Sequence, residues 1–259
     1  MPRQQGDGLL VWYDLMTTDE ETTDVFYSKL FGWEFDAESD QENGYRLIAN
    51  DLEPFGGTLP FEAPLQSNWM LYLQVTDLDA RTARAVELGA TIHMGKTEVP
   101  EVGHWVILAD PTGAPFYLFE PYPERRSGMT GCDTGQGRVI WNELITTDLT
   151  AAADFYREIA GWDLVAVTPG DNPYTVAKID RMPIAGLFQP GTPPANSMWI
   201  VSFQTNDIDD SIVRVEALGG KVIHPANTMP GVGRTAWVAD PTGAVFGLMQ
   251  SEAGWLERL

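Results

Sequence analysis

The sequence predicts an α+β protein built from two copies of one domain, each containing two βαβββ modules. The segment LVWYDLMTTD at Leu10–Asp19 returns as VIWNELITTD at Val139–Asp148. The segment DPTGAPF at Asp110–Phe116 returns as DPTGAVF at Asp240–Phe246. Within each copy, short β-branched and aromatic runs alternate with only two helix-like segments, which is typical of small sheets with few helices.

The repeat has the length of a whole domain. Trp12 and Trp141 lie 129 residues apart, and matching residues in the second half of each copy lie 130 apart. Solenoid repeats are much shorter, at roughly 20–50 residues. We expect domains at residues 9–121 and 138–251, joined by a linker at 122–137 that is rich in glycine, proline and charge.

The first half of copy one has the pattern of a strand, a helix and three more strands. The run Leu10–Thr17 is β-branched and aromatic, as expected of a central strand. Asp19 is a suitable N-cap and Gly32 a suitable stop, so we expect a helix between them. Further strands are expected where short apolar runs are separated by turn residues, at 33–37, 45–49 and 55–59.

The second half of copy one repeats this order. A strand is expected at 69–75, followed by a helix capped by Asp77 and stopped at Gly89. The last hairpin contains the DPTG turn, in which proline fixes φ and glycine takes a positive φ. Its aspartate is expected to bond the backbone ahead of it. Strands are expected at 91–94, 105–109 and 116–120.

Composition and charge exclude several classes of partner. The formal net charge of −21 repels nucleic acids and anionic membranes, so we expect neither as a partner. There is no apolar run of 18 residues and no apolar signal core at the N-terminus, which favours a soluble, cytoplasmic protein. The single cysteine, Cys132, cannot form an internal disulfide and is expected to be an incidental exposed thiol.

Several of these motifs resemble a known superfamily. The paired βαβββ modules, the helix motifs FYSKLFGW at Phe26–Trp33 and FYREIAGW at Phe155–Trp162, and the DPTG hairpins resemble the vicinal oxygen chelate superfamily. This superfamily contains glyoxalase I, extradiol dioxygenases and bleomycin-resistance drug-binding proteins. The order of motifs is similar, more narrowly, to tandem glyoxalase-like proteins. The resemblance implies that each domain is a curled mixed sheet with helices outside, forming a cup that binds a ligand.

The resemblance also implies positions for metal ligands. Metal-dependent members carry a His, Gln or Glu on the first strand and a Glu on the last strand. Here those positions hold Trp12, Trp141, Tyr117 and Gly247. A divalent ion needs three or four converging nitrogen or oxygen ligands, so we expect no standard metal site and no cofactor. None of the three histidines shares a repeat position with another: His93, His104 and His224.

Strand alternation predicts what the cups contain instead. Side chains two residues apart share a strand face, so Trp12 brings Asp14 into the first cup and Trp141 brings Glu143 into the second. We expect an aromatic-lined ligand site that also includes Trp69, Tyr117 and Trp199. The alternative is that the tryptophans are ordinary core residues.

The two carboxylates need either water or a partner, because an unpaired buried carboxylate costs several kcal/mol. We name Arg46, His104 and Arg234 as candidate partners. Asp14 and His104 would form a catalytic acid–base pair in the first cup. Arg234 would suit the binding of an anionic group in the second cup.

Three functions remain open from the sequence. The first is a metal-free protein that binds a small aromatic or hydrophobic molecule. The second is a lyase or isomerase of the glyoxalase class that acts on a small oxygenated compound. The third is an interaction module whose cups are filled by their own side chains. Because the tandem can build a dimer-like arrangement within one chain, we prefer a monomer and leave a homodimer open.

Overall fold

The computed structural model describes residues 6–40, 44–62, 66–125, 135–168, 174–192 and 194–259. Cys132 and most of the predicted linker lie outside these residues. The described part contains four α-helices and sixteen β-strands. No helix among the described residues is both long enough and apolar enough to cross a membrane.

Both copies contain the same order of elements. Copy one comprises β1 (Leu10–Thr17), α1 (Glu20–Phe31), β2 (Glu34–Asp40), β3 (Tyr45–Asn50), β4 (Glu53–Pro60), β5 (Asn68–Gln74), α2 (Leu78–Glu87), β6 (Thr91–Val99), β7 (Gly103–Ala109) and β8 (Pro115–Pro121). Copy two comprises β9 (Val139–Ile145), α3 (Leu149–Ala160), β10 (Asp163–Thr168), β11 (Tyr174–Ile179), β12 (Met182–Phe188), β13 (Met198–Gln204), α4 (Ile208–Ala217), β14 (Lys221–Met229), β15 (Gly233–Ala239) and β16 (Val245–Ser251). Two short 3₁₀ turns follow the last strands, at Pro123–Arg125 and Leu256–Arg258.

The predicted helix ends are confirmed in copy one. The Asp19 carboxylate accepts a hydrogen bond from the Thr22 backbone N–H at 3.0 Å, so Asp19 is the N-cap of α1. The helix stops at Gly32, whose φ of 83° lies in the left-handed region. Asp77 caps α2 in the same way, by accepting from the backbone N–H of Ala80.

Each copy contributes one mixed eight-stranded sheet. The first sheet has the order β2-β3-β4-β1-β5-β8-β7-β6, and the second has the order β10-β11-β12-β9-β13-β16-β15-β14. β1 pairs with β4 and β5 with β8 in parallel, whereas the hairpins are antiparallel. The parallel pairs arise because a helix follows the first strand of each module. The α+β class with two tandem copies is confirmed, while the predicted domain limits stay a prediction.

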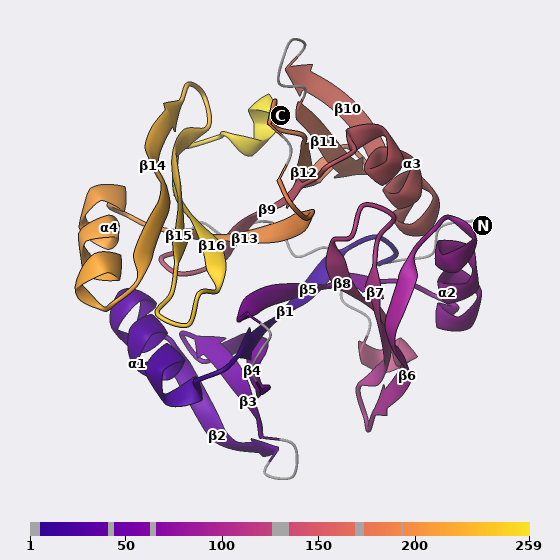
Figure 1. Cartoon of the computed structure of the whole chain (residues 1–259), viewed down its shortest axis with the longest axis horizontal. Coiled ribbons are helices and arrows are strands. Elements are labelled where there is room, and N and C mark those ends of the chain that lie inside the picture. Colours follow the sequence, from indigo (N-terminus) through magenta and orange to yellow (C-terminus); the bar gives the residue numbers. More distant parts are fainter. Residues whose placement is uncertain (1–5, 41–43, 63–65, 126–134, 169–173, 193) are drawn as a thin grey trace. The chain divides into compact units, whose positions relative to one another are not determined.

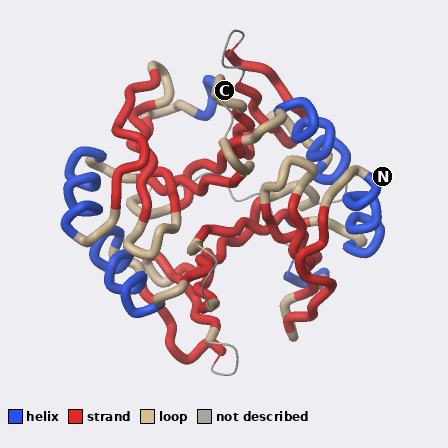
Figure 2. The backbone as a smooth tube through the Cα atoms, viewed as in Figure 1, coloured by secondary structure: helices blue, strands red, loops and turns tan. Residues whose placement is uncertain are grey.

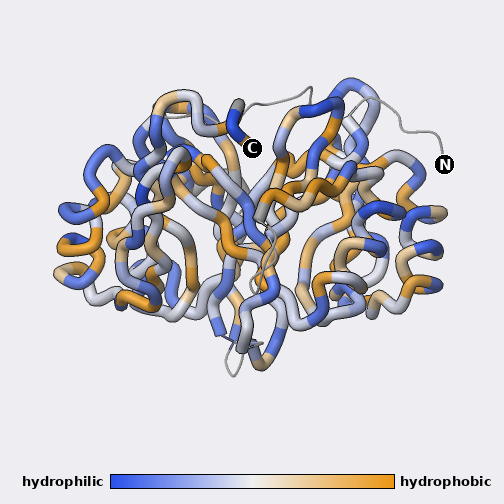
Figure 3. The backbone as a smooth tube through the Cα atoms, turned by 90° about the horizontal axis from the view of Figure 1, so that it is seen from above, coloured by the Kyte–Doolittle hydropathy of each residue, from blue (hydrophilic) through white to orange (hydrophobic). Residues whose placement is uncertain are grey.

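The chain divides into two compact units that each combine halves of both copies. The first unit comprises residues 1–12, 71–131 and 142–199, and the second comprises residues 13–70, 132–141 and 200–259. In the first unit α2 contacts α3, and in the second α1 contacts α4 (Figure 1). Within each unit the helices cover one side of the strands, shown in blue and red in Figure 2. Hydrophobic and hydrophilic residues alternate along the helices, as expected when one helix face packs on a sheet (Figure 3).

A chain of hydrogen bonds runs through the core of the second unit. Trp69 Nε1 donates to Tyr27 Oη at 3.0 Å, and Tyr27 Oη donates to Asp240 Oδ2 at 3.1 Å. Asp240 Oδ1 accepts from the backbone N–H groups of Thr242 and Ala244 in its DPTG turn, as predicted. Burial raises the pKa of Tyr27 well above its usual value. The bonds therefore join α1 of copy one to a turn of copy two.

The first unit contains the matching chain. Trp199 Nε1 donates to Tyr156 Oη at 3.0 Å, and Tyr156 Oη donates to Asp110 Oδ2 at 3.1 Å. Trp199 and Trp69 are thus buried under the helices, and our expectation that they line the cups is wrong. The physical reason is strand alternation, which places each indole on the helix-covered face of its strand.

Two left-handed glycines of the second unit test how tightly this core is packed. At Gly32 an added Cβ would have no neighbour within 4 Å, whereas at Gly137 it would lie 2.8 Å from Trp33 Nε1 and 2.9 Å from Phe31 Cβ. Gly32→Ala should lower the free energy of unfolding by about 1–2 kcal/mol, the cost of a left-handed alanine. Gly137→Ala should lower it by at least about 1 kcal/mol more, because Trp33 must move. Urea unfolding of the two variants measures the difference, and equal losses would contradict the packing described.

Candidate functional site

A carboxyl–phenol pair occupies the face of β1 that lies opposite the helix side. Asp14 is only 1% exposed, and its Oδ1 accepts a hydrogen bond from Tyr45 Oη at 2.8 Å. Asp14 pairs in register with Gly57, where an added Cβ would lie 2.1 Å from the Tyr45 ring. The glycine therefore leaves the space in which the ring crosses β4 to reach the carboxylate.

Copy two holds the same pair with a longer acid. Glu143 pairs in register with Gly186, and its carboxyl is hydrogen-bonded to Tyr174, the counterpart of Tyr45. Burial raises the pKa of Glu143 from its ordinary 4.5 to about 7, and the bond from Tyr174 opposes this rise. Glu143 remains partly exposed, in contrast to Asp14. The carboxyl of copy two therefore exists in both protonation states near neutral pH.

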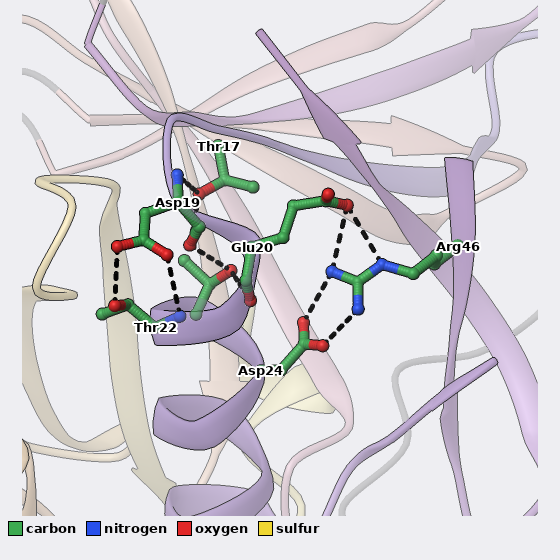
Figure 4. Close-up of polar contacts among 7 residues, drawn as sticks. Thr17, Asp19, Glu20, Thr22, Asp24 and Arg46 are labelled. Carbon is green, nitrogen blue, oxygen red and sulfur yellow. Dashed lines mark hydrogen bonds and ion pairs between the residues drawn. The ribbon is translucent and has the colours of Figure 1, made fainter. Parts of the chain in front are cut away.

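Arg46 is not the partner of Asp14, contrary to one of our expectations. Its guanidinium donates to Glu20 Oε1 at 3.0 Å and to both carboxylate oxygens of Asp24 (Figure 4). Arg46 pairs in register with Thr58 of β4, and that residue pairs with Leu15 of β1 on the helix-covered face. Because neighbouring residues face opposite ways, Tyr45 and not Arg46 points to the side that carries Asp14.

Arg234 also lies on the helix side of its strand. Its Nη1 and Nη2 donate to the Asp209 carboxylate at 2.7 and 2.9 Å. It alternates with Ala236 and Val238, both buried on that same face of β15. The expectation that Arg234 binds an anionic group in the cup is therefore wrong, because its charge is already paired with α4.

His104 follows the same pattern in copy one. It alternates with the buried Val106, whereas the next residue, Trp105, packs edge-on against Tyr117 at 5.2 Å. Its register partner is Glu120, whose carboxylate accepts from the backbone N–H groups that open α2. The expected cup position of His104 is thus wrong by one residue along the strand. Because His104 lies on the helix-covered face and Asp14 on the face opposite the helices, the two do not fit an acid–base pair within one cup.

Tyr117 occupies one implied metal-ligand position and is part of an aromatic stack. Its ring lies 4.0 Å from that of Tyr72 with an interplanar angle of 8°, and it is 1% exposed. Copy two has Gly247 and Ser202 at the matching positions. A Cβ on Gly247 would lie 2.0 Å from Ser202 Oγ, so the small residue is required there. At this pair of strands, stacked tyrosines in copy one are therefore replaced by small residues in copy two.

The two tryptophans on the first strands differ in their surroundings. Trp12 is partly exposed, whereas Trp141 is 6% exposed and packs edge-on against Trp255 at 5.3 Å. Trp255 follows the last strand, and its buried Nε1 has no hydrogen-bond partner among the described residues. Its counterpart in copy one is Arg125. Because Trp255 lies beyond the repeated motifs, no sequence pattern pointed to this contact.

The implied metal positions do not fit a divalent cation. Trp12, Trp141 and Gly247 offer no ligand atom, and Tyr117 is stacked on Tyr72. Within the described ranges, no three His, Cys, Asp or Glu side chains come together in a group that could hold a metal ion.

The fold defines an α+β protein with two tandem copies of one domain that contains two βαβββ modules. The family model described as "Glyoxalase-like domain" matches residues 11–119 and 140–249. The chain therefore belongs to the glyoxalase-like domain family, in two tandem copies.

Curated relatives cover nearly the whole chain. The chain is 31% identical over 247 residues to "Putative glyoxylase CFP32" of Mycobacterium bovis, covering 92% of this chain and 93% of that protein. It is also 31% identical over 270 residues to "Anthracycline biosynthesis protein DnrV" of Streptomyces peucetius, covering 96% and 95% respectively.

Solved structures support the fold at lower identity. A 2,2',3-trihydroxybiphenyl 1,2-dioxygenase from Sphingomonas wittichii matches with a TM-score of 0.63 and 16% identity, covering 95% of this chain and 91% of that one. A Mn(II)-bound glyoxalase from Novosphingobium aromaticivorans matches with a TM-score of 0.65 and 14% identity, covering 95% and 83%. These likenesses concern the fold alone.

The hydrogen bond between Tyr174 and Glu143 predicts that removing the Tyr174 hydroxyl changes the pKa of Glu143. Tyr174→Phe removes a hydrogen bond that favours the carboxylate, so the pKa of Glu143 should rise above about 7. Side-chain ¹³C NMR titration of the glutamates measures it. Tyr45→Phe is the matched control in copy one and should leave Glu143 unchanged. A lower pKa of Glu143 in Tyr174→Phe would contradict the assignment.

Glu143 should also make stability depend on pH. Its folded-state pKa of about 7 exceeds the ordinary value of 4.5. The contribution of Glu143 to the free energy of unfolding is therefore full below pH 4.5 and is lost as the pH rises through 7. Over this window wild type should lose about 3 kcal/mol relative to Glu143→Gln. Urea unfolding of both proteins at pH 4.5 and pH 8 measures the difference, and a pH-independent difference would show that Glu143 has no raised pKa.

Proposed function

We propose that this glyoxalase-like protein binds a small, planar aromatic or hydrophobic molecule in its predicted cups, without the metal site usual in its superfamily. One observation carries the proposal. In both copies a carboxyl–phenol pair lies two residues from a tryptophan on the same strand face: Asp14–Tyr45 beside Trp12, and Glu143–Tyr174 beside Trp141.

The chemistry of these groups suits a flat, oxygenated ligand. Indole rings stack on planar molecules, while a few fixed polar groups orient them. A carboxyl and a phenol together offer a donor and several acceptors, which match carbonyl and hydroxyl groups on a ligand. The protein's net charge of −21 favours a neutral or cationic molecule over an anion.

The names of two relatives suggest a more specific class. DauV of Streptomyces sp. strain C5 and DnrV of Streptomyces peucetius are both anthracycline biosynthesis proteins, and each is 31% identical to this chain. From these two names we propose that the present protein prefers polycyclic aromatic compounds that carry carbonyl and hydroxyl groups.

We favour the second copy as the functional one. Glu143 is partly exposed and titrates near pH 7, whereas Asp14 is 1% exposed beneath Tyr45. The stacked rings of Tyr72 and Tyr117 already occupy the corresponding strands of copy one.

A second candidate, a lyase or isomerase of the glyoxalase class, is favoured by the pKa of Glu143. A carboxylate with a pKa near ambient pH is an efficient general base. It could accept a proton from a carbon beside a carbonyl group, leaving the electron pair on the carbonyl oxygen as an enolate. Return of the proton from the neutral Glu143 carboxyl to another carbon would complete an isomerisation, with the hydrogen bond from Tyr174 keeping that carboxyl group in position.

Binding of 1,8-dihydroxyanthraquinone, a neutral planar probe, tests the proposal by isothermal titration calorimetry. We expect saturable binding to wild type that weakens at least tenfold in Glu143→Gln, because a neutral amide replaces the carboxylate acceptor and its NH2 group cannot accept from the ligand. Asp14→Asn is the matched control in copy one and should bind like wild type.

The pattern of results separates the candidate functions. Absence of saturable binding to the folded wild type would contradict the proposal and favour a module whose cups are filled by their own side chains. Equal losses in the two variants would contradict the assignment to copy two. Deuterium incorporation into a bound carbonyl compound, lost in Glu143→Gln, would favour the isomerase.

A further inference from the structure

Copy two carries a row of residues on the face of its sheet that lies opposite the helices. The row crosses the adjacent strands β14, β15, β16 and β13 in register and consists of His224, Trp237, Gly247 and Ser202. Trp237 lies between Ala236 and Val238, which are buried on the helix-covered face of β15, so its own side chain takes the opposite face. The whole row belongs to the second compact unit.

The equivalent row of copy one is covered by aromatic rings. It consists, in the same register, of Met94, Ile107, Tyr117 and Tyr72. The rings of Tyr72 and Tyr117 are stacked with their centroids 4.0 Å apart, and these residues are 8% and 1% exposed. Trp105 packs edge-on against Tyr117, and Phe119 packs edge-on against Tyr72. The chain's own rings thus fill this part of the face in copy one.

Copy two has no ring at any of the corresponding positions, which hold Ser202, Thr235, Gly247 and Met249. The ring that copy two adds to the row is Trp237, at the position of Ile107. Trp237 is partly exposed, and within the described ranges its ring contact is with His224, edge-on at 4.8 Å. At least one broad face of the indole therefore has no ring of the described residues against it.

A mostly buried hydroxyl lies beside this indole. Ser202 is 9% exposed, and its Oγ makes no hydrogen bond within the part of the chain that the structure describes. Its side chain lies over Gly247, since a Cβ on that glycine would be 2.0 Å from Ser202 Oγ. Buried hydroxyl groups are more stable with a hydrogen-bond partner than without one. The Ser202 hydroxyl is therefore available to a polar group of a ligand.

We propose that this row of copy two binds a phenolic ring, which takes the place that the tyrosine rings hold in copy one. The ring would stack on Trp237 above Gly247, and its hydroxyl would share a hydrogen bond with Ser202 Oγ. This binding rests on the proposed function, which assigns ligands to the face opposite the helices, and it specifies phenols as their class. The copies thus differ in whether the rings come from the chain or from a ligand.

Ligand-observed ¹⁹F NMR titration with 4-fluorophenol tests the proposal, with fluorobenzene as the ring that lacks the hydroxyl. We expect saturable binding of 4-fluorophenol, and fluorobenzene should bind at least about fivefold more weakly because it cannot bond to Ser202. The indole N–H resonance of Trp237, assigned by its absence from the spectrum of Trp237→Ile, should shift during the titration. Lack of saturable binding, equal affinity for the two probes or an unshifted Trp237 resonance would overturn the proposal.

Variants of the row locate the site. Ser202→Ala should weaken 4-fluorophenol binding at least about threefold and leave fluorobenzene binding unchanged. Trp237→Ile, which carries the residue of copy one, should weaken the binding of both probes at least about threefold. Tyr72→Phe is the matched control, because it removes a hydroxyl at the position of Ser202 in copy one, and it should bind like wild type. Weaker binding in Tyr72→Phe with unchanged binding in Ser202→Ala would contradict the assignment to copy two.

Titration with 1,8-dihydroxyanthraquinone distinguishes failure of this site from failure of the proposed function. If this larger probe binds in a way that depends on Glu143 while 4-fluorophenol does not bind, the phenol site is wrong and the proposed function stands. If neither probe binds to folded wild type, both are wrong.

Discussion

The structure depends on two buried phenols, Tyr27 and Tyr156, each of which accepts from an indole and donates to a carboxylate. Tyr27 lies on the first helix of copy one, and its carboxylate partner Asp240 belongs to copy two. Tyr156 makes the reciprocal bond to Asp110. Each aspartate also accepts from its own turn at Oδ1, and the phenol donates to its other carboxylate oxygen, Oδ2, so the core of each compact unit is bonded across halves of both copies. Each compact unit is therefore built from parts of both copies of the repeat.

These core bonds are the same in both copies, whereas several positions on the opposite strand faces differ. The helix-covered faces hold the same tryptophan, tyrosine and aspartate in both copies. The opposite faces hold different residues at matching positions, in the pairs Asp14 and Glu143, Tyr72 and Ser202, and Tyr117 and Gly247. The longer acid is the one with a pKa raised to about 7. The two copies thus share these core bonds but differ on the opposite strand faces.

The sequence predicted the repeat, the order of elements and the helix caps, because these depend on local spacing and turn chemistry. It also placed Asp14 and Glu143 on the face opposite the helices. It missed Tyr45 and Tyr174, since their contacts depend on strand register and on a glycine in the neighbouring strand. The predicted cup positions of Trp69, His104 and Arg234 were wrong for one common reason. Alternation divides a strand into two faces but does not say which one the helix covers.

A double-mutant cycle between Tyr27→Phe and Asp240→Asn tests the exchange of halves most directly. Urea unfolding of the two single variants and the double variant gives the coupling free energy. The account predicts coupling of about 1–3 kcal/mol for this pair, as for a buried hydrogen bond to a charged group. It predicts none between Tyr27 and Asp110, the equivalent aspartate of the same copy. Additive effects for Tyr27 with Asp240, together with coupling to Asp110, would contradict it.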